Sequence, residues 1–284
     1  MKKIIAMLLA LTMVLSLGAL AFADEEAAEA PEVPDYLLDL DLPEFTTIED
    51  GKLIMSTNAA FPPYEMVADG EGFAGTGFEG IDVEIAWYLA QAVGLELQID
   101  DMEFTSALVA VQDNKSDMML AGLTYNEERD EVMDFSTSYA TGVQVVIVPE
   151  DSEIETVDDL ANAEMIGTQS GTTGYLYCSD TPENGGYGED HVTAYDNGAT
   201  AVQALVNGQI DAVVIDDGPA KEYVAANPGL KILETAYVTE DYCLAVDQDN
   251  TDLLEALNTV LEAMIDNGLV EEIVSHYVSA DVAE

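Results

Sequence analysis

Arg129 is the only arginine in the chain, and it lies in the segment AGLTYNEER (residues 121–129), directly after an apolar, strand-like run. A guanidinium presents a planar fork of N–H donors that matches a carboxylate, and lysine cannot reproduce that geometry. The alternative is a surface ion pair with Glu127, Asp130 or Glu131. Every other Lys or Arg position is a lysine, so a single arginine at this place indicates a carboxylate-binding role.

A second candidate anion site is the segment SGTTG (residues 170–174), which follows a strand-like run and precedes a short helical stretch. Backbone N–H groups at a helix start, with the hydroxyls of Thr172 and Thr173 beside them, attract negative charge. The segment lacks the spacing and the lysine of a nucleotide-phosphate loop. A plain capped turn is the alternative.

Asp216 ends the apolar run 212–215, where a strand leaves the core. Its carboxylate can neutralise an ammonium group. Asp217 beside it is the rival candidate, and we expect one of the two only to cap the helix that follows.

Three aromatic residues are candidates for contacts to a ligand side chain. Phe61 and Tyr64 flank two prolines that stiffen the segment 59–65, and Phe104 lies in a short polar stretch further on. Rigid aromatic rings beside a cleft can sandwich a side chain or cover a cation. For each of the three, a place in the core is the alternative.

The sequence contains no recognisable catalytic or metal-binding set. It has neither G-x-S-x-G nor a G-x-G-x-x-G directly after the first strand, and no paired histidine and nucleophile. His191 and His276 stand alone, so we expect no metal and no cofactor. Cys178 and Cys243 are the only cysteines, and one disulfide or two buried thiols are both open.

From Lys52 onward, apolar strand-like runs alternate with helical patterns, an order that predicts an α/β fold with parallel-rich sheets. The spacing of apolar residues predicts a helix over residues 82–94, closed by Gly94. Two apolar stripes near the C-terminus, at 254–265 and 270–277, predict two more helices packed on the core. Strands are expected at residues 95–99, 118–121, 143–148, 165–168, 212–215 and 230–233.

Two stretches of the chain, residues 107–122 and 201–216, share one plan. Each has an apolar helix, a polar turn, an aspartate (Asp117 or Asp211) and a buried strand. This weak internal repeat predicts two similar lobes.

Polar residues follow the strands of both predicted lobes at equivalent places. Gly122 and Asp216 end one pair of strands, and Asn58 and Gln169 end another. Ligands of open parallel sheets bind beyond the carboxyl ends of the strands. Two lobes that face each other by those ends would therefore place these four residues around one cleft.

The N-terminus has the pattern of a secretory signal peptide. Lys2 and Lys3 precede an apolar run at residues 4–20, and small residues at Ala21 and Ala23 precede acidic ones. We expect cleavage near Ala23 and export to the periplasm or the extracellular face, and a retained membrane anchor is the alternative. Residues 24–45, rich in proline, acidic and small residues, are expected to form a flexible lead-in.

The chain is strongly acidic. Asp and Glu number 57 against seven Lys and Arg, so the formal charge is −50. Removal of Lys2 and Lys3 with the signal peptide changes it by −2, to about −52. Such a surface repels nucleic acid and anionic lipid, and we expect neither as a partner.

In its motifs the chain resembles the bacterial extracellular solute-binding proteins of family 3, the polar amino-acid receptors of ABC importers. The matching segments are STNAAFPPY (56–64), GIDVE (80–84), DMMLAGLT (117–124) with Glu128 and Arg129, DFS (134–136), GTQSGTT (167–173) and GQIDAVVID (208–216). The resemblance implies a two-lobe, type II periplasmic-binding-protein-like fold with a hinge near residues 139–143 and 239–242. Lobe 1 would comprise residues 46–142 and 241–284, and lobe 2 residues 143–240.

The resemblance also implies roles for the residues above. Arg129 would clamp the carboxylate of an amino acid, assisted by Gly122, Thr124 and the turn at Thr172 and Thr173. The monomeric receptor would then deliver its ligand to a membrane permease.

The rest of the ligand would be held by other residues. Asp216 would take the α-ammonium group, and Phe61, Tyr64 and Phe104 would pack around the side chain.

One departure from the family bears on the ligand. Many members that take cationic or amide side chains have an acid where Asn58 stands, so its loss favours a neutral polar side chain. Gln169 offers no positive charge to a second carboxylate, which disfavours glutamate.

Two other functions are weaker alternatives. The fold also resembles that of exported dehydratases of cyclohexadienyl amino acids, but no residue stands out as the general acid that such an enzyme needs. A sensor module of a receptor is disfavoured because the sequence ends at Glu284 without a spanning helix or a signalling domain.

Overall fold

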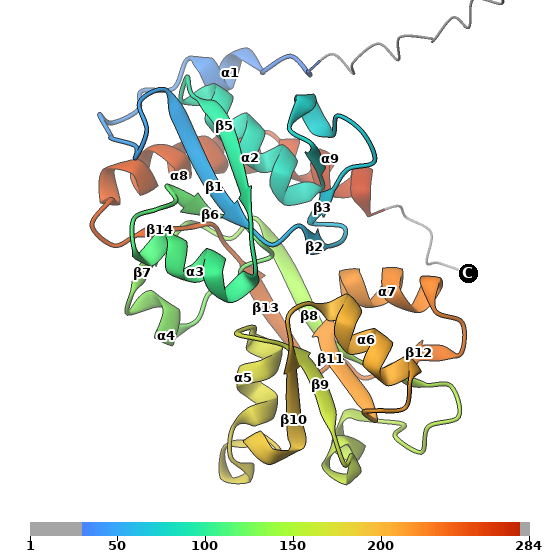
Figure 1. Cartoon of the computed structure of the whole chain (residues 1–284). Helices are drawn as coiled ribbons and strands as arrows, with labels where there is room; N and C mark the ends of the chain where they lie inside the picture. Colours follow the sequence, from blue (N-terminus) through green and yellow to red (C-terminus); the bar gives the residue numbers. More distant parts are fainter. Residues whose placement is uncertain (1–29, 279–284) are drawn as a thin grey trace, which may run out of the picture.

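Two sheets with helices packed on them form two lobes, which Figure 1 shows one above the other. The computed structural model describes residues 30–278. The expected signal peptide, residues 1–23, lies outside that range. Within residues 30–278, no helix is long and apolar enough to cross a membrane. The architecture is the expected α/β, two-lobe type II fold.

The sheet of the first lobe is mixed, because a strand from the far end of the chain completes it. In spatial order its strands are β5 (Glu96–Asp101), β1 (Lys52–Thr57), β6 (Met118–Met119), β14 (Ala245–Asp247) and β7 (Met133–Phe135). β1 lies parallel to β5 and β6, whereas β14 pairs antiparallel with β6 and β7.

Helices cover both faces of this sheet. Successive strand residues point to opposite sides, and apolar side chains on both sides pack against helices. Met118 belongs to the large apolar cluster that also holds α2, α8 and α9, whereas Met119 packs with α3 on the other side. The helices are α2 (Ile81–Ala92), α3 (Phe104–Gln112), α8 (Thr251–Asp266) and α9 (Leu269–Tyr277).

The predicted helices are present with small differences. α2 is followed by Gly94 at φ 75°, the left-handed conformation that glycine adopts easily. In α8, Leu257 and Leu261 are fully buried, but Ile265 of the predicted apolar stripe is 37% exposed. Ile265 lies in the last turn of the helix, where the packed face ends.

The sheet of the second lobe has the spatial order β10 (Val192–Tyr195), β9 (Ile166–Gln169), β11 (Ala212–Asp216), β8 (Ala140–Pro149) and β12 (Leu230–Ile232). β9 is parallel to both β10 and β11, and β11 is antiparallel to β8. Its helices are α5 (Thr173–Ser179), α6 (Gly198–Val206) and α7 (Asp217–Ala226).

Two antiparallel segments connect the lobes. β13 (Val238–Tyr242) pairs with the start of β8, from Val238 opposite Gln144 to Tyr242 opposite Ala140. These are the segments in which the crossovers were expected, and Figure 1 shows both strands running from one lobe to the other.

The expected flexible lead-in is wrong for the part that the structure describes, residues 30–45. A short helix, α1 (Asp35–Leu38), contacts α8, and Leu37 is completely buried. Tyr36 and Leu40 pack against the same core. The acidic composition hid these apolar residues, whose burial holds the segment on the first lobe.

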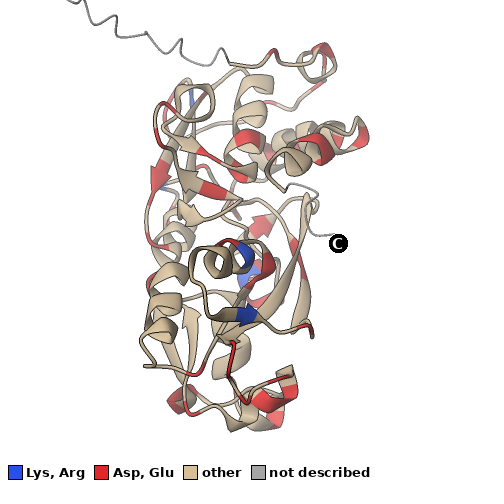
Figure 2. Cartoon of the chain, turned by 90° about the vertical axis from the view of Figure 1, so that its right-hand side faces the viewer, with Lys and Arg blue, Asp and Glu red and all other residues tan. Residues whose placement is uncertain are grey.

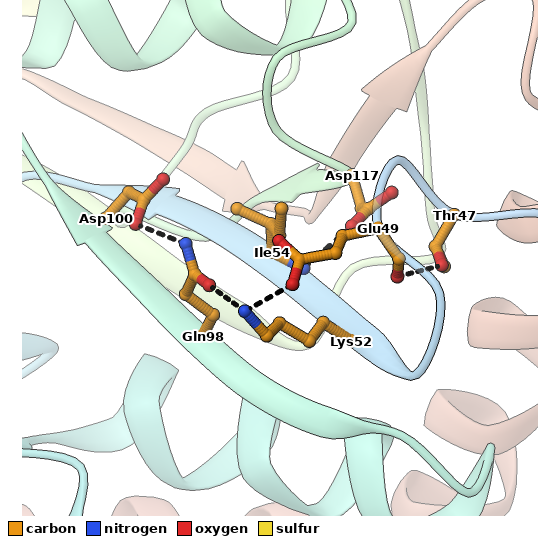
Figure 3. Close-up of polar contacts among 7 residues, drawn as sticks. All are labelled: Thr47, Glu49, Lys52, Ile54, Gln98, Asp100 and Asp117. Carbon is orange, nitrogen blue, oxygen red and sulfur yellow. Dashed lines mark hydrogen bonds and ion pairs between the residues drawn. The ribbon is translucent and has the colours of Figure 1, made fainter.

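The paired aspartates of the internal repeat do the same work in both lobes. Asp117 accepts the N–H of Ile48 and of Ile54 at 2.8 Å, and Figure 3 shows its bond to Ile54 in β1 beside Lys52 and Gln98. Asp211 accepts N–H groups just before β9, from Glu164 at 2.6 Å and Met165 at 3.0 Å. Each aspartate thus ties its own strand to the entry of the strand beside it.

A small third sheet and several short helices complete the described chain. The sheet comprises β2 (Ala60–Phe61), β3 (Glu65–Val67) and β4 (Phe78–Glu79). The short helices are α4 (Glu127–Asp130) and the 3-10 helices η1 (Phe73–Gly75), η2 (Val157–Asn162), η3 (Pro182–Asn184) and η4 (Glu189–His191).

Candidate ligand-binding site

A pocket lies between the lobes, where the carboxyl ends of the strands of both sheets meet, and its empty space of about 330 Å³ includes open solvent. The residues that line the cavity are Asn58, Phe61, Glu65, Phe104, Ala121, Gly122, Thr124, Arg129, Gln169, Thr172, Thr173 and Asp216. Every residue that the sequence singled out for ligand contacts is among them except Tyr64.

The Arg129 side chain is buried at one side of the cavity. Asn126 caps α4 by accepting the Arg129 N–H at 2.8 Å, which fixes the residue at the start of this short helix. Its Nη1 donates to the carbonyl of Thr124 at 2.6 Å, and its Nη2 to the carbonyl of Gly171 in the other lobe at 3.1 Å. The guanidinium carbon lies 5.5 Å from the centre of the Phe104 ring.

These contacts decide between the two interpretations of Arg129. Within residues 30–278 the guanidinium forms no ion pair with a carboxylate within 4.0 Å, so the proposed surface pair with Glu127, Asp130 or Glu131 is wrong. Burial lowers the pKa of Arg129 to about 10, so the side chain stays charged at neutral pH. Backbone carbonyls hold its fork without neutralising it, which leaves its charge available to an anion.

The turn before α5 lies opposite Arg129 and is both a capped turn and part of the cavity wall. The Thr172 hydroxyl accepts the N–H of Tyr175 at 3.4 Å, and Thr173 is buried. Gly171 has φ 76°, and a Cβ there would meet the Thr105 side chain of the first lobe at 2.6 Å. A glycine is therefore needed for the lobes to approach this closely.

On the second lobe the Asp216 carboxylate faces the same cavity. Tyr242 donates its hydroxyl to Oδ1, and Gln144 donates Nε2 to Oδ2 at 2.8 Å. Burial, with the charge of Glu240 nearby, raises the pKa of Asp216 to about 7, although the bonds from Tyr242 and Gln144 oppose the rise. Its rival Asp217 lies outside the lining and pairs with Lys221 at 2.5 Å.

Glu240 is a buried carboxylate of the crossover strand β13 that the sequence analysis missed. It accepts hydrogen bonds from Thr124 of the first lobe at 3.2 Å and from Tyr177 of the second at 2.8 Å. Gln144 bridges it to Asp216, since the same Nε2 reaches Glu240 at 2.9 Å. An acid inside a predicted crossover was the only available signal, and 57 acidic residues masked it.

Two amides that the sequence assigned to ligand selection bind each other across the cleft. Gln169 donates Nε2 to the Asn58 Oδ1 at 2.8 Å, and Asn58 donates Nδ2 to the Met102 carbonyl at 2.9 Å. This pair therefore fastens the second lobe to the first.

The aromatic candidates separate into two groups. Phe61 and Phe104 line the cavity, whereas Tyr64 lies behind it, in an edge-to-face contact with Tyr242 at 5.1 Å between ring centres. The core alternative was therefore correct for Tyr64, because its ring packs against the crossover instead of facing the ligand space.

The backbone at Gly122 is already occupied on its N–H side. Asp82, in the first turn of α2, accepts the Gly122 N–H at 2.7 Å and the Tyr139 hydroxyl at 2.7 Å. Gly122 has φ 51°, and a Cβ there would meet the Phe61 ring at 2.6 Å. Gly122 thus shapes the wall, and its N–H is not free for a ligand carboxylate.

Cys178 and Cys243 are free, buried thiols, so the disulfide alternative is wrong. Burial raises the pKa of both, which keeps them protonated. Within residues 30–278 no group of histidine, cysteine and acidic side chains is placed to hold a metal ion. Figure 2 shows Asp and Glu on both lobes and few basic residues, in keeping with the charge of −50.

Comparison with known proteins identifies relatives of this architecture. Residues 53–280 match the model of a family described as bacterial extracellular solute-binding proteins, family 3. The chain is 30% identical over 225 residues to the arginine-binding extracellular protein ArtP of Bacillus subtilis, an alignment that covers 78% of this chain and 84% of that one.

Solved structures agree with this. A mutant of ArgBP from T. maritima superposes with a TM-score of 0.71 and 33% identity, covering 81% of this chain and 96% of that one. An ancestral arginine-binding protein has been solved both with arginine and with glutamine. Both structures give a TM-score of 0.72 and 31% identity, over 81% of this chain and 99% of theirs.

Proposed function

The chain belongs to the bacterial extracellular solute-binding proteins of family 3, and on that premise we propose that it is an exported receptor for a free polar amino acid. It binds the amino acid between its lobes and delivers it to an ABC importer in the membrane. It acts as a monomer after its signal peptide is cleaved near Ala23.

The observation that carries this proposal is the placement of one buried arginine and one buried aspartate in the wall of one cavity. Arg129 takes the α-carboxylate, with Thr172 and Thr173 beside it, and Asp216 takes the α-ammonium. A micromolar dissociation constant requires about −8 kcal/mol. Two charge-assisted contacts of about 1.5 to 3 kcal/mol each, together with apolar burial against Phe61 and Phe104, are of that size.

The preference for one side chain is a finer part of the proposal. From Asn58 and Gln169 the sequence favours a neutral polar side chain. The relatives named above bind arginine, and one of them is also solved with glutamine. Because Asn58 and Gln169 bond each other in the closed cleft, another residue of the cavity must make the choice.

The receptor reading also implies that the ligand leaves unchanged. Relatives are named as binding proteins. Incubation with prephenate or arogenate should therefore yield no product, and product formation would favour the dehydratase alternative.

Calorimetric titration of the twenty amino acids into wild-type protein and three variants tests the assignment. Arg129→Ala should abolish binding of every ligand, and Arg129→Lys should restore little of it, because an ammonium cannot form the planar fork. Lys115→Ala is the matched control, since it removes an exposed charge that pairs with Asp113, and it should bind normally. Unchanged affinity in a folded Arg129→Ala variant would refute the proposed carboxylate clamp.

A further inference from the structure

We propose that Glu65 selects the side chain of the ligand, by pairing its carboxylate with a guanidinium or ammonium group. This inference rests on the proposed function and names the ligand class: an amino acid with a cationic side chain. It replaces the neutral side chain that the sequence favoured.

Glu65 occupies an unusual place for a carboxylate. It begins β3, opposite Phe61 in the β2–β3 hairpin, so its side chain is carried into the cavity wall beside that ring. Its relative exposure is 0%, neither carboxylate oxygen receives a hydrogen bond from a neutral donor among the described residues, and the side chain adjoins the carboxyl group of Asp82. The other acids of the site, Asp82, Asp216 and Glu240, each accept at least two hydrogen bonds from neutral donors.

A buried carboxylate without a partner is costly when it is ionised. It must either hold a proton or meet a cation. Burial raises the pKa of Glu65 well above its usual value, and the carboxylates of Asp82, Asp216 and Asp101 raise it further. The phenols of Tyr64, Tyr139 and Tyr223 are also close enough to feel its charge. The empty site therefore holds Glu65 as a neutral acid.

The charge balance of the occupied site points to a cation. The α-carboxylate and α-ammonium of an amino acid balance Arg129 and Asp216, which leaves Glu65 as the cavity-lining carboxylate without a cation or a neutral donor among the described residues. Arg129 is engaged by the α-carboxylate in the proposed function, and it forms no ion pair with Glu65 within 4.0 Å. A positive side chain neutralises Glu65 and supplies the donors that its two oxygens lack.

The other candidate for recognising the ligand side chain, Asn58, is already hydrogen-bonded within the protein. The Asn58 amide already bonds Gln169 and Met102. The Phe61 ring beside Glu65 offers an aromatic surface, which suits a flat guanidinium.

Binding of a cationic ligand then has a proton balance. The Glu65 carboxyl gives its proton to the buffer, and the ligand cation takes its place. A neutral ligand of the same shape leaves the proton on Glu65, whose O–H donates to a ligand oxygen. Arginine and citrulline make this comparison, because a guanidinium replaces a urea on otherwise equal chains.

The experiment is calorimetric titration of L-arginine and L-citrulline into wild-type protein and Glu65→Gln, near neutral pH in two buffers of different ionisation enthalpy. Wild type should bind arginine more tightly than citrulline and release more protons with arginine, because Asp216, whose pKa is about 7, loses its proton on pairing with the α-ammonium of either ligand. Glu65→Gln should weaken arginine by roughly 10- to 100-fold, the range for a lost charge-assisted bond, and change citrulline by less than about 3-fold. Its ligand-free unfolding temperature should not fall, because a partnerless acid is replaced by an amide of the same shape.

The possible failures are distinguishable. Equal weakening of both ligands by Glu65→Gln, a wild type that prefers citrulline, or equal proton release with arginine and citrulline in wild type would each overturn the role of Glu65 while the receptor function stands. If wild type binds none of the twenty amino acids, the proposed function falls, and this inference falls with it.

Discussion

At the scale of single residues, the site is notable for how many carboxylates surround one arginine. Asp82, Asp216, Glu65 and Glu240 are all buried, whereas Arg129 is the only basic side chain that lines the cavity. Such a cluster cannot be fully ionised without cost, because like charges in a poorly solvated site repel each other. Some of these carboxyl groups therefore stay protonated in the folded protein, and the free energy of unfolding of the empty protein must depend on pH.

Asp82 gives the clearest test of this dependence. Burial raises its pKa to about 6, against about 3.9 in an unfolded chain, although bonds from Gly122 and Tyr139 oppose the rise. The folded protein therefore binds this proton more tightly than the unfolded chain does. The resulting contribution of Asp82 to the free energy of unfolding is on the order of 3 kcal/mol. It is fully present below about pH 4 and is lost as pH rises through about 6. Asp82→Asn has no such proton, so its free energy of unfolding should fall less than that of wild type between pH 4.5 and 7.5.

Urea denaturation of ligand-free protein across this pH range is the measurement. Asp190→Asn removes an exposed carboxylate and should keep the wild-type pH dependence. Parallel curves for wild type and Asp82→Asn would show that Asp82 is already ionised at low pH, contrary to the effect of its burial.

At the scale of elements, the internal repeat makes a comparison between two aspartates. Asp117 uses one oxygen for Ile48 and the other for Ile54, and it is almost completely buried. Asp211 uses the single oxygen Oδ2 for both Glu164 and Met165, and it is partly exposed. The two residues have equivalent places in their lobes, but the Asp117 position requires two acceptor oxygens and the Asp211 position requires one.

Substitution should separate these demands. Asp117→Ala should lower the free energy of unfolding by about 3 kcal/mol and Asp211→Ala by about 1 to 2 kcal/mol, because backbone donors lose a charged acceptor. An asparagine keeps one acceptor oxygen, so Asp211→Asn should recover most of the loss and Asp117→Asn only part of it. Urea denaturation measures all four variants. Equal recovery at both positions would contradict the bonding pattern.

How much of the site the sequence reveals also follows from its elements. The rule that ligands bind beyond the ends of parallel strands brought Asn58, Gly122, Gln169 and Asp216 to one cleft, because each directly ends a recognisable strand. Glu65 could not be found in this way, since it reaches the cavity from the short β2–β3 hairpin. Strands of two and three residues are too short to show a periodic pattern in the sequence.

The lead-in shows the same limit from another side. Leu37 and its apolar neighbours are spaced among acids and prolines, so composition indicated flexibility. Only the presence of α8, about 200 residues later in the chain, makes their burial possible. Local composition describes what a segment can do alone, and tertiary contacts decided otherwise here.

At the scale of the whole molecule, the closed arrangement includes direct bonds between the lobes. Gln169 bonds Asn58, Arg129 bonds Gly171, and the Tyr223 hydroxyl donates to the Ala60 carbonyl at 2.9 Å. These bonds favour closure whatever ligand is present. The apparent affinity of any ligand scales with the population of the closed form, so it depends on contacts that the ligand never makes.

Tyr223 tests this separation of closure from recognition, because it does not line the cavity. Tyr223→Phe removes only the hydroxyl, and the closed form should lose about 1 kcal/mol. Every amino acid that binds should therefore be weakened by about the same factor, roughly 3- to 10-fold, unlike the selective loss expected for Glu65→Gln. Tyr175→Phe is the matched control, since its hydroxyl bonds Glu189 within the second lobe and should not affect closure. Calorimetry with several ligands measures the factor by which each affinity falls.

X-ray scattering of the ligand-free protein should show a more open average conformation for Tyr223→Phe than for wild type. A loss of affinity confined to one ligand would instead mean that Tyr223 takes part in recognition, and closure and selectivity would then depend on the same residues.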